Sequence, residues 1–226
     1  MVIWLAGTSC VGKSTIVKNI IKQFDSFEIC KPVGIVRCTK FGKLLVVGGT
    51  YTKKVNSPGL DGDSRGSKVK RNNNFKELIS REYSKNQNIL CETQSPVFFN
   101  KELLYWLIDN FQFKMFHLKT DKTTLDERAK KRNCGWWDKQ RTDKRTIKDI
   151  NYVNSIVSDE KISKHIIELT NDNMYDSMEN TKIISKFMRD NMSEEYIDFV
   201  NSVTSQQSKS HSYFKESLDI MKEQGA

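Results

Sequence analysis

The sequence predicts an α/β protein in which a parallel sheet is flanked by helices. Short apolar segments typical of buried strands alternate along the chain with amphipathic segments typical of helices. The expected strands are residues 2–6, 33–39, 43–47, 88–91, 114–118 and 166–169. The expected helices are residues 14–24, 75–85, 103–111 and 124–132. Strands that alternate with helices usually run parallel, because each helix crosses one face of the sheet before the next strand begins.

The N-terminal segment contains a phosphate-binding loop. The apolar run 2–6 leads directly into the pattern G-x-x-x-x-G-K-S, and residues 14–24 have a helical apolar face. A strand, this loop and a helix form the P-loop, in which backbone N–H groups cradle nucleotide phosphates. Lys13 is expected to reach the β- and γ-phosphates and the Ser14 hydroxyl to bind Mg²⁺, so ATP and Mg²⁺ are the predicted cofactors. The expected nucleotide-binding residues are Gly7, Thr8, Ser9, Cys10, Val11, Gly12, Lys13, Ser14 and Thr15.

Glu92 directly follows the apolar run 88–91 and is a candidate for a second group near Mg²⁺. Sheets of this class bind their ligands at the carboxyl ends of the strands, and no aspartate ends an apolar strand in this sequence. We therefore expect Glu92 to hold Mg²⁺ through water or to contact the phosphate acceptor. The alternative is that Glu92 only caps the loop that follows it.

Residues 48–74 contain Gly, Pro, Asn, Ser and Asp and almost no apolar residue. A loop of this length within a compact domain is usually functional or disordered. Asp61 and Asp63 lie in its glycine-rich centre, and a positioned aspartate can orient an acceptor hydroxyl and take its proton. Both aspartates are therefore candidate catalytic residues of an acceptor loop. The alternative is a loop in which they only form turns.

Arg128 and Arg132 lie four residues apart in an expected helix and so share one face. Arginine beside a transferring phosphoryl group stabilises the charge on its oxygens. Both are expected as catalytic residues of a basic lid at about residues 128–149, and solvated surface arginines are the alternative. Trp136-Trp137 lies in the same polar stretch, where stacking on a base is one interpretation.

The positive charge of the chain is concentrated in two segments. The formal net charge is +9, residues 53–77 hold seven Lys/Arg against three Asp/Glu, and residues 119–150 hold eleven against six. In an ATP-binding protein, such segments favour contact with the phosphates of nucleotides or nucleic acid. Lys68, Lys70 and Arg71 are the expected phosphate contacts if the acceptor is DNA.

Composition disfavours several other classes of protein. No apolar run approaches the ~20 residues of a membrane span, and the N-terminus lacks the layout of a signal peptide, so we expect a cytoplasmic protein with no membrane contact. The five cysteines include no Cys-x-x-Cys pair, which argues against a disulfide framework and a zinc site. Reduced thiols are expected, with Mg²⁺ as the only metal.

Over about residues 1–172 the chain resembles the small nucleoside and nucleotide kinase group. The resemblance rests on the N-terminal P-loop, the strand end at Glu92, and the arginine helix followed by a polar lid. Val46-Val47-Gly48-Gly49-Thr50-Tyr51 followed by Gly59-Leu60-Asp61 is also similar to a Gly-x-Tyr … Gly-Thr-Asp pattern of bacteriophage P-loop kinases. Those kinases include enzymes that phosphorylate 5-hydroxymethyluracil in DNA. Leu60 stands in the place of Thr and Gly62-Asp63 follows, so either aspartate can correspond to the one in the pattern.

Together these features predict a P-loop NTPase fold of the kinase type at residues 1–190 and a C-terminal helical appendage at residues 191–226. The resemblance implies an ATP-dependent kinase that phosphorylates a hydroxyl of a nucleotide substrate. The preferred acceptor is the 5-hydroxymethyl group of a modified pyrimidine in phage DNA. A nucleoside monophosphate kinase acting on free dNMPs is the first alternative, and a nucleic-acid-binding NTPase is the second.

Overall fold

The structure, a computed structural model, describes residues 1–34, 36–48, 68–84, 87–93, 100–131 and 139–190. The side chains of residue 68 and of most residues in 139–150 are outside this description. The chain divides into two compact units, residues 1–185 and 186–226. The sheet belongs to the first unit, and the appendage predicted at residues 191–226 lies outside the described residues.

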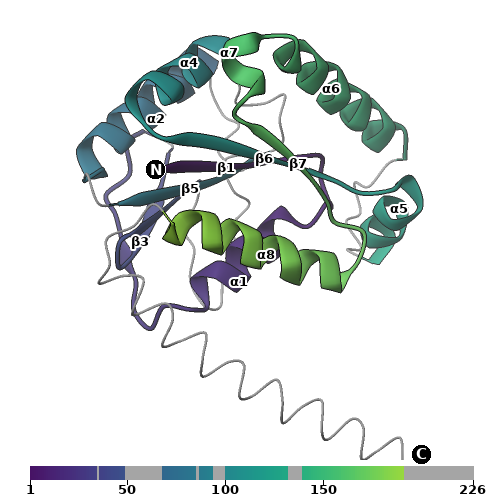
Figure 1. Cartoon of the computed structure of the whole chain (residues 1–226), viewed down its shortest axis with the longest axis horizontal. Helices are drawn as coiled ribbons and strands as arrows, with labels where there is room; N and C mark the ends of the chain where they lie inside the picture. Colours follow the sequence, from purple (N-terminus) through teal and green to yellow (C-terminus); the bar gives the residue numbers. More distant parts are fainter. Residues whose placement is uncertain (35, 49–67, 85–86, 94–99, 132–138, 191–226) are drawn as a thin grey trace, which may run out of the picture. The chain divides into compact units, whose positions relative to one another are not determined.

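Seven strands form one mixed sheet in the order β2-β3-β4-β5-β1-β6-β7 (Figure 1). Their bounds are β1 Val2–Ala6, β2 Glu28–Ile29, β3 Cys38–Phe41, β4 Leu44–Val47, β5 Asn88–Thr93, β6 Phe113–Lys119 and β7 Ile166–Thr170. The five strands β4, β5, β1, β6 and β7 pair in parallel, which confirms the predicted α/β fold. The strands β2 and β3 add an antiparallel edge that the sequence pattern did not predict.

A tight hairpin creates the antiparallel edge. The turn between β3 and β4 lies between Phe41 and Leu44, which pair with each other. Gly42 has a φ of 56°, a left-handed conformation that glycine adopts without the penalty of a Cβ. A connection this short can join only antiparallel strands, whereas a parallel pair needs a crossover of a dozen residues or more.

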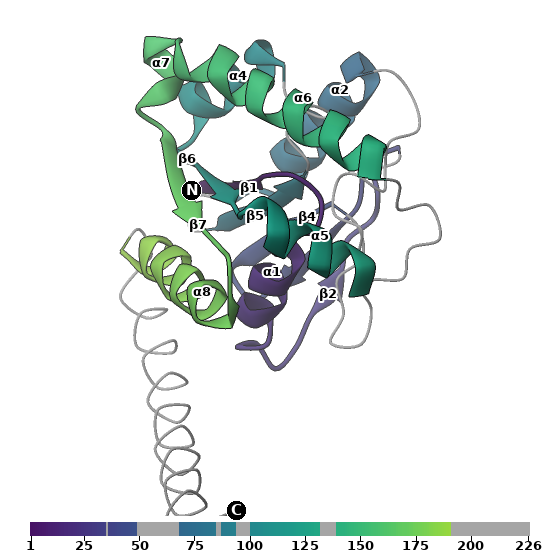
Figure 2. The same cartoon turned by 90° about the vertical axis from the view of Figure 1, so that its right-hand side faces the viewer.

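Seven helices lie within the described residues. Their bounds are α1 Lys13–Ile21, α2 Lys68–Glu82, α4 Lys101–Asn110, α5 Lys122–Lys131, α6 Lys139–Val157, α7 Glu160–Ser163 and α8 Met174–Arg189. In the first unit, α1 and the beginning of α8 cover one face of the sheet, and α2, α4 and α6 cover the other (Figures 1 and 2). Part of the predicted lid is thus the first half of α6. No helix in the described part of the chain has the length and apolar composition to cross a membrane.

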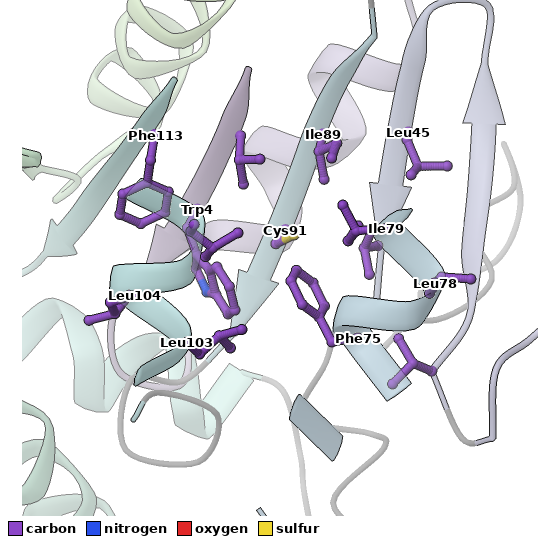
Figure 3. Close-up of a cluster of buried hydrophobic side chains, with 14 of the residues drawn as sticks. Trp4, Leu45, Phe75, Leu78, Ile79, Ile89, Cys91, Leu103, Leu104 and Phe113 are labelled. Atoms are coloured by element: carbon purple, nitrogen blue, oxygen red, sulfur yellow. The ribbon is translucent and has the colours of Figure 1, made fainter. Parts of the chain in front are cut away.

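The larger apolar core lies between the sheet and the helices α2 and α4. Trp4 is fully buried at its centre, and its ring centroid is 5.4 Å from that of Phe75 on α2. Figure 3 shows Leu103 of α4 on the other side of the same indole and Cys91 of β5 beside it (Figure 3). Because side chains alternate along a strand, Trp4 fixes which residues of β1 face this core and which face α1.

The strand order places a topological switch point at β1. From β1 the chain first adds β4 and β5 on one side, and later β6 and β7 on the other. The strands β5 and β6 therefore flank β1 on opposite sides. Open α/β sheets bind ligands at such a switch point.

Candidate active site

The loop between β1 and α1 has the backbone of a phosphate-binding nest. Gly7, Cys10 and Gly12 have φ values of 139°, 68° and 100°, so the chain turns repeatedly within six residues. A Cβ on Gly7 would lie 2.5 Å from the carbonyl oxygen of Leu118, which leaves no room for a side chain. Such turns direct successive N–H groups into one concavity, where they can bind an anion.

The N-terminus of α1 adds to this site. Gly12 occupies the N-cap position and offers no side chain to cap the helix, and the first turn contains no acidic residue. The positive end of the helix dipole is therefore not neutralised by the helix's own side chains. A phosphate group at this position can accept hydrogen bonds from the backbone N–H groups, and the helix dipole stabilises its negative charge.

Lys13 lies across the loop. Its side chain is buried, and Nζ donates hydrogen bonds to the carbonyl oxygens of Gly7 at 2.7 Å and Thr8 at 2.9 Å. These contacts hold the ammonium group over the concavity, where the charge of a bound polyphosphate would lie. The Lys13 ammonium thus lies at the loop, and its contact with the β- and γ-phosphates stays a prediction.

Ser14 and Glu92 lie together beside this loop. The Ser14 hydroxyl donates a hydrogen bond of 3.0 Å to Oε1 of Glu92. Glu92 is 2% exposed and pairs in register with Leu5 of the adjacent β1, so it reaches α1 from the neighbouring strand. A hydroxyl and a carboxylate are the hard oxygen donors that Mg²⁺ prefers, with phosphates and water completing its coordination. The two residues that the sequence links to Mg²⁺ separately therefore suit one ion together.

Arg128 reaches the same loop from α5. The buried side chains of Leu125 and Ala129 anchor this helix. Nη1 of Arg128 is then 3.4 Å from the carbonyl oxygen of Val11. The other predicted catalytic residues, Asp61, Asp63 and Arg132, lie outside the described residues, as does the Trp136-Trp137 pair.

No protein-family model and no curated protein matches the chain. Similar solved structures include the YorR protein of Bacillus subtilis in complex with phosphorylated GDP, with 14% sequence identity and a TM-score of 0.50 over 83% of this chain and 95% of that one. They also include shikimate kinase of Bacteroides thetaiotaomicron, with 12% identity and a TM-score of 0.43 over 83% of this chain and 98% of that one. The protein has an α/β P-loop kinase fold.

The P-loop kinase fold also brings Asn171 to the loop, a residue that sequence reasoning missed. Asn171 follows β7 and is 1% exposed, and its Nδ2 donates a 2.5 Å hydrogen bond to the carbonyl oxygen of Val11. The available signal was the polar run Thr170-Asn171-Asp172-Asn173 at the end of the last strand. This run could have indicated a site residue, because β7 is a parallel strand whose carboxyl end reaches the ligand edge of the sheet.

Among the basic residues at the start of α2, Arg71 is more buried than expected. Lys70 is exposed, whereas Arg71 is only 6% exposed and the neighbouring Asn72 only 5%. Arg71 therefore does not present its charge to solvent as a surface phosphate contact would require. Both buried side chains lie one turn before Phe75, on the stripe of α2 that faces the sheet.

A second charged group lies on the strands beyond β1. His117 of β6 is buried, and its Nδ1 is 3.7 Å from Oε1 of Glu168 on β7. Lys119 is 2.5 Å from the same oxygen, and its hydrogen bond holds the pKa of Glu168 below its ordinary value. The sequence analysis did not single out this group.

Three of the four described cysteines behave as small apolar residues. Cys30, Cys38 and Cys91 are buried, and burial raises the pKa of Cys38 and Cys91. A raised pKa keeps a thiol protonated and unreactive. Cys30 and Cys38 face each other across β2 and β3, and both are free thiols.

Proposed function

We propose that the protein is an ATP-dependent phosphotransferase that transfers the γ-phosphate of ATP to a hydroxyl of a nucleotide substrate. The observation that carries this proposal is the 3.0 Å hydrogen bond between the Ser14 hydroxyl and the buried Glu92 carboxylate, one residue from Lys13. A P-loop that only bound phosphate would not need a buried carboxylate beside its serine. A P-loop that positions Mg²⁺ on a reacting phosphate would.

The loop residues have separate tasks in this proposal. The backbone N–H groups between Gly7 and Gly12 bind the phosphates. Lys13 exchanges the carbonyl oxygens of Gly7 and Thr8 for oxygens of the β- and γ-phosphates. Its charge then offsets the negative charge on the transferring group.

Ser14 and Glu92 would hold Mg²⁺, directly or through water. When bound, the ion neutralises charge on the β- and γ-phosphates. Glu92 can accept the hydrogen bond that the Ser14 hydroxyl donates in the structure. This bond directs the lone pairs of the serine oxygen away from the carboxylate. Those lone pairs are then available to the ion.

Arg128 is proposed to stabilise the transferring phosphoryl group. Its guanidinium already touches the Val11 carbonyl at the rim of the loop. Arginine remains protonated at every working pH and presents several donors in one plane, which suits phosphoryl oxygens. Asp61 or Asp63 is proposed to orient the acceptor hydroxyl, and Arg132 to act with Arg128.

For the acceptor, the 5-hydroxymethyl group of a pyrimidine in DNA remains the preferred proposal. The support is the similarity of residues 46–61 to phage P-loop kinases and the two basic segments of the chain. Free deoxynucleoside monophosphates are the second candidate. The complex of YorR with phosphorylated GDP favours this alternative, because it concerns a free nucleotide on a similar fold.

The test is a transfer assay with γ-labelled ATP, Mg²⁺ and three acceptors: hydroxymethylated DNA, unmodified DNA and free dNMPs. We expect label in hydroxymethylated DNA alone. Label only in dNMPs would select the second candidate, and label in none of the three would contradict both. Lys13→Ala is the inactive control, and Lys22→Ala, at an exposed position beyond the same helix, is its matched charge control.

A further inference from the structure

Asn171 connects the end of β7 with the P-loop through a side-chain amide that is hydrogen-bonded at both its nitrogen and its oxygen. Nδ2 donates to the carbonyl oxygen of Val11 at 2.5 Å, and Oδ1 accepts from Nδ2 of Asn180 at 3.3 Å. Asn180 lies on α8 and also donates to the carbonyl oxygen of Thr170 at 2.8 Å. The backbone N–H of Asn171 donates to the carbonyl oxygen of Lys119 at 2.8 Å. The amide is therefore fixed in both position and orientation.

The contact with Val11 also orients the next N–H group of the loop. The carbonyl of Val11 and the N–H of Gly12 belong to one peptide unit, and the described residues contain no cis peptide bond. In a planar trans unit, the C=O and N–H bonds point in opposite directions. Holding the Val11 oxygen toward buried Asn171 thus turns the Gly12 N–H the other way, away from Asn171.

Gly12 and Asn171 fit one another closely. A Cβ on Gly12 would lie 2.3 Å from Nδ2 of Asn171, so the amide occupies the space that a side chain at position 12 would need. Gly12 also has a φ of 100°, which other residues rarely adopt. The peptide unit between Val11 and Gly12 is therefore restrained on one side by the amide and on the other by the backbone conformation.

We infer that Asn171 is a positioning residue for phosphate binding, which holds the Gly12 N–H in the orientation that a bound phosphate requires. The nature of the ligand rests on the proposed function, whereas the effect on the loop does not. An amide that merely satisfied its own buried polar atoms would stabilise the fold. An amide that fixes the orientation of a loop N–H group also affects how tightly phosphate binds.

The experiment compares Asn171→Ala with the wild type in two measurements. Hydrogen exchange of the nucleotide-free protein reports the order of the loop, and we expect faster exchange of the amides at residues 7–15. Titration with a non-hydrolysable ATP analogue and Mg²⁺ reports binding, and we expect affinity to fall about tenfold, the scale of one lost hydrogen bond. Asn180→Ala, which removes the hydrogen bonds to the Asn171 amide oxygen and the Thr170 carbonyl but leaves the bond from Asn171 to Val11, is expected to have a smaller effect.

Asn110→Ala is the matched control. The Asn110 amide also donates to a backbone carbonyl, that of Trp106 at 2.8 Å, but it lies at the exposed end of α4. Asn171→Asp is the second test variant, because it keeps the size of the side chain and places a carboxylate oxygen where Nδ2 donates. It is expected to bind the analogue at least as weakly as Asn171→Ala.

The outcomes separate this inference from the proposed function. Wild-type affinity in both Asn171 variants, with unchanged loop exchange, would overturn the positioning role even if their melting temperatures fall. Faster loop exchange together with weaker binding supports it. A wild type that binds no nucleotide would contradict the proposed function, and the exchange measurement would then still decide whether Asn171 orders the loop.

Discussion

Replacing Glu92 by Gln is predicted to separate catalysis from stability. The variant keeps the size of the side chain and an oxygen that can accept the 3.0 Å hydrogen bond from Ser14, but it removes the negative charge. If that charge helps to hold Mg²⁺ on the phosphates, its loss removes stabilisation from the transition state. Loss of one electrostatic partner at such a position typically costs about 2.7–4 kcal/mol, or roughly 10²–10³ in kcat.

The same substitution should not destabilise the protein without ligand. Glu92 is 2% exposed, and a carboxylate removed from water carries a desolvation cost of several kcal/mol that a neutral amide largely avoids. The free energy of unfolding without Mg²⁺ is therefore expected to be unchanged or higher by roughly 1 kcal/mol or more. For a chain of this length, each kcal/mol corresponds to about 2–4 °C in melting temperature.

The assay measures phosphate transfer as a function of Mg²⁺ concentration, together with thermal unfolding without the ion. Glu77→Gln, an exposed position on α2, is the control for a change of net charge. Full transfer by Glu92→Gln at limiting Mg²⁺ would refute the assignment of this residue to the metal. Loss of folding in the variant would instead favour a structural role as the cap of the following loop.

Three further predictions concern the loop and one surface ion pair. Gly12→Ala should abolish nucleotide binding and destabilise the fold by about 1–3 kcal/mol, because position 12 has a φ of 100° and a Cβ there would meet the buried amide of Asn171. Titration with the ATP analogue and melting curves measure the two effects. Lys13→Ala should lower transfer by roughly 10² or more in steady-state kinetics, and near-normal transfer would exclude the loop as the catalytic phosphate site. Lys40 and Glu82 form a 2.8 Å ion pair that holds the pKa of Glu82 below its ordinary 4.5 and that of Lys40 above its ordinary 10.5. The stability difference between wild type and Glu82→Gln should therefore be constant near neutral pH. This stability difference should shrink as pH falls below 4.5, where the carboxylate protonates, and as pH rises above 10.5, where the amine deprotonates. Urea unfolding of both proteins at several pH values measures the difference.

Local pattern was sufficient to predict the centre of the fold. The run 2–6, the glycine loop and the helix after it are consecutive in sequence, so their arrangement follows from backbone chemistry alone. The place of Glu92 could also be predicted, because the residue that ends a parallel strand reaches the ligand edge of the sheet. Its hydrogen bond with Ser14 could not be predicted, since 78 residues separate the two and only the order of β5 and β1 brings them together.

The features that escaped prediction depend on tertiary packing. Arg71 reads as a surface cation in a basic segment, yet the apolar contact of Phe75 with Trp4, one turn away, draws that stripe of α2 onto the sheet. Asn171 reads as an ordinary polar residue after a strand. Its role depends on the proximity of β7 to the loop after β1, across β6, which the sequence pattern does not specify.

The loop carbonyl groups indicate which end of the P-loop is fixed and which responds to ligand. The oxygens of Gly7 and Thr8 accept hydrogen bonds from the ammonium of Lys13, which would release them on binding phosphate as proposed. The oxygen of Val11 accepts a 2.5 Å hydrogen bond from Asn171, a buried neutral amide, and also lies 3.4 Å from Nη1 of Arg128. The bond from Asn171 remains if Arg128 turns to a phosphoryl group as proposed. The end of the loop next to α1 can therefore keep its geometry through the binding cycle. The end next to β1 exchanges internal hydrogen bonds for ligand contacts, so the charge of Lys13 remains solvated by protein oxygens until a phosphate replaces them.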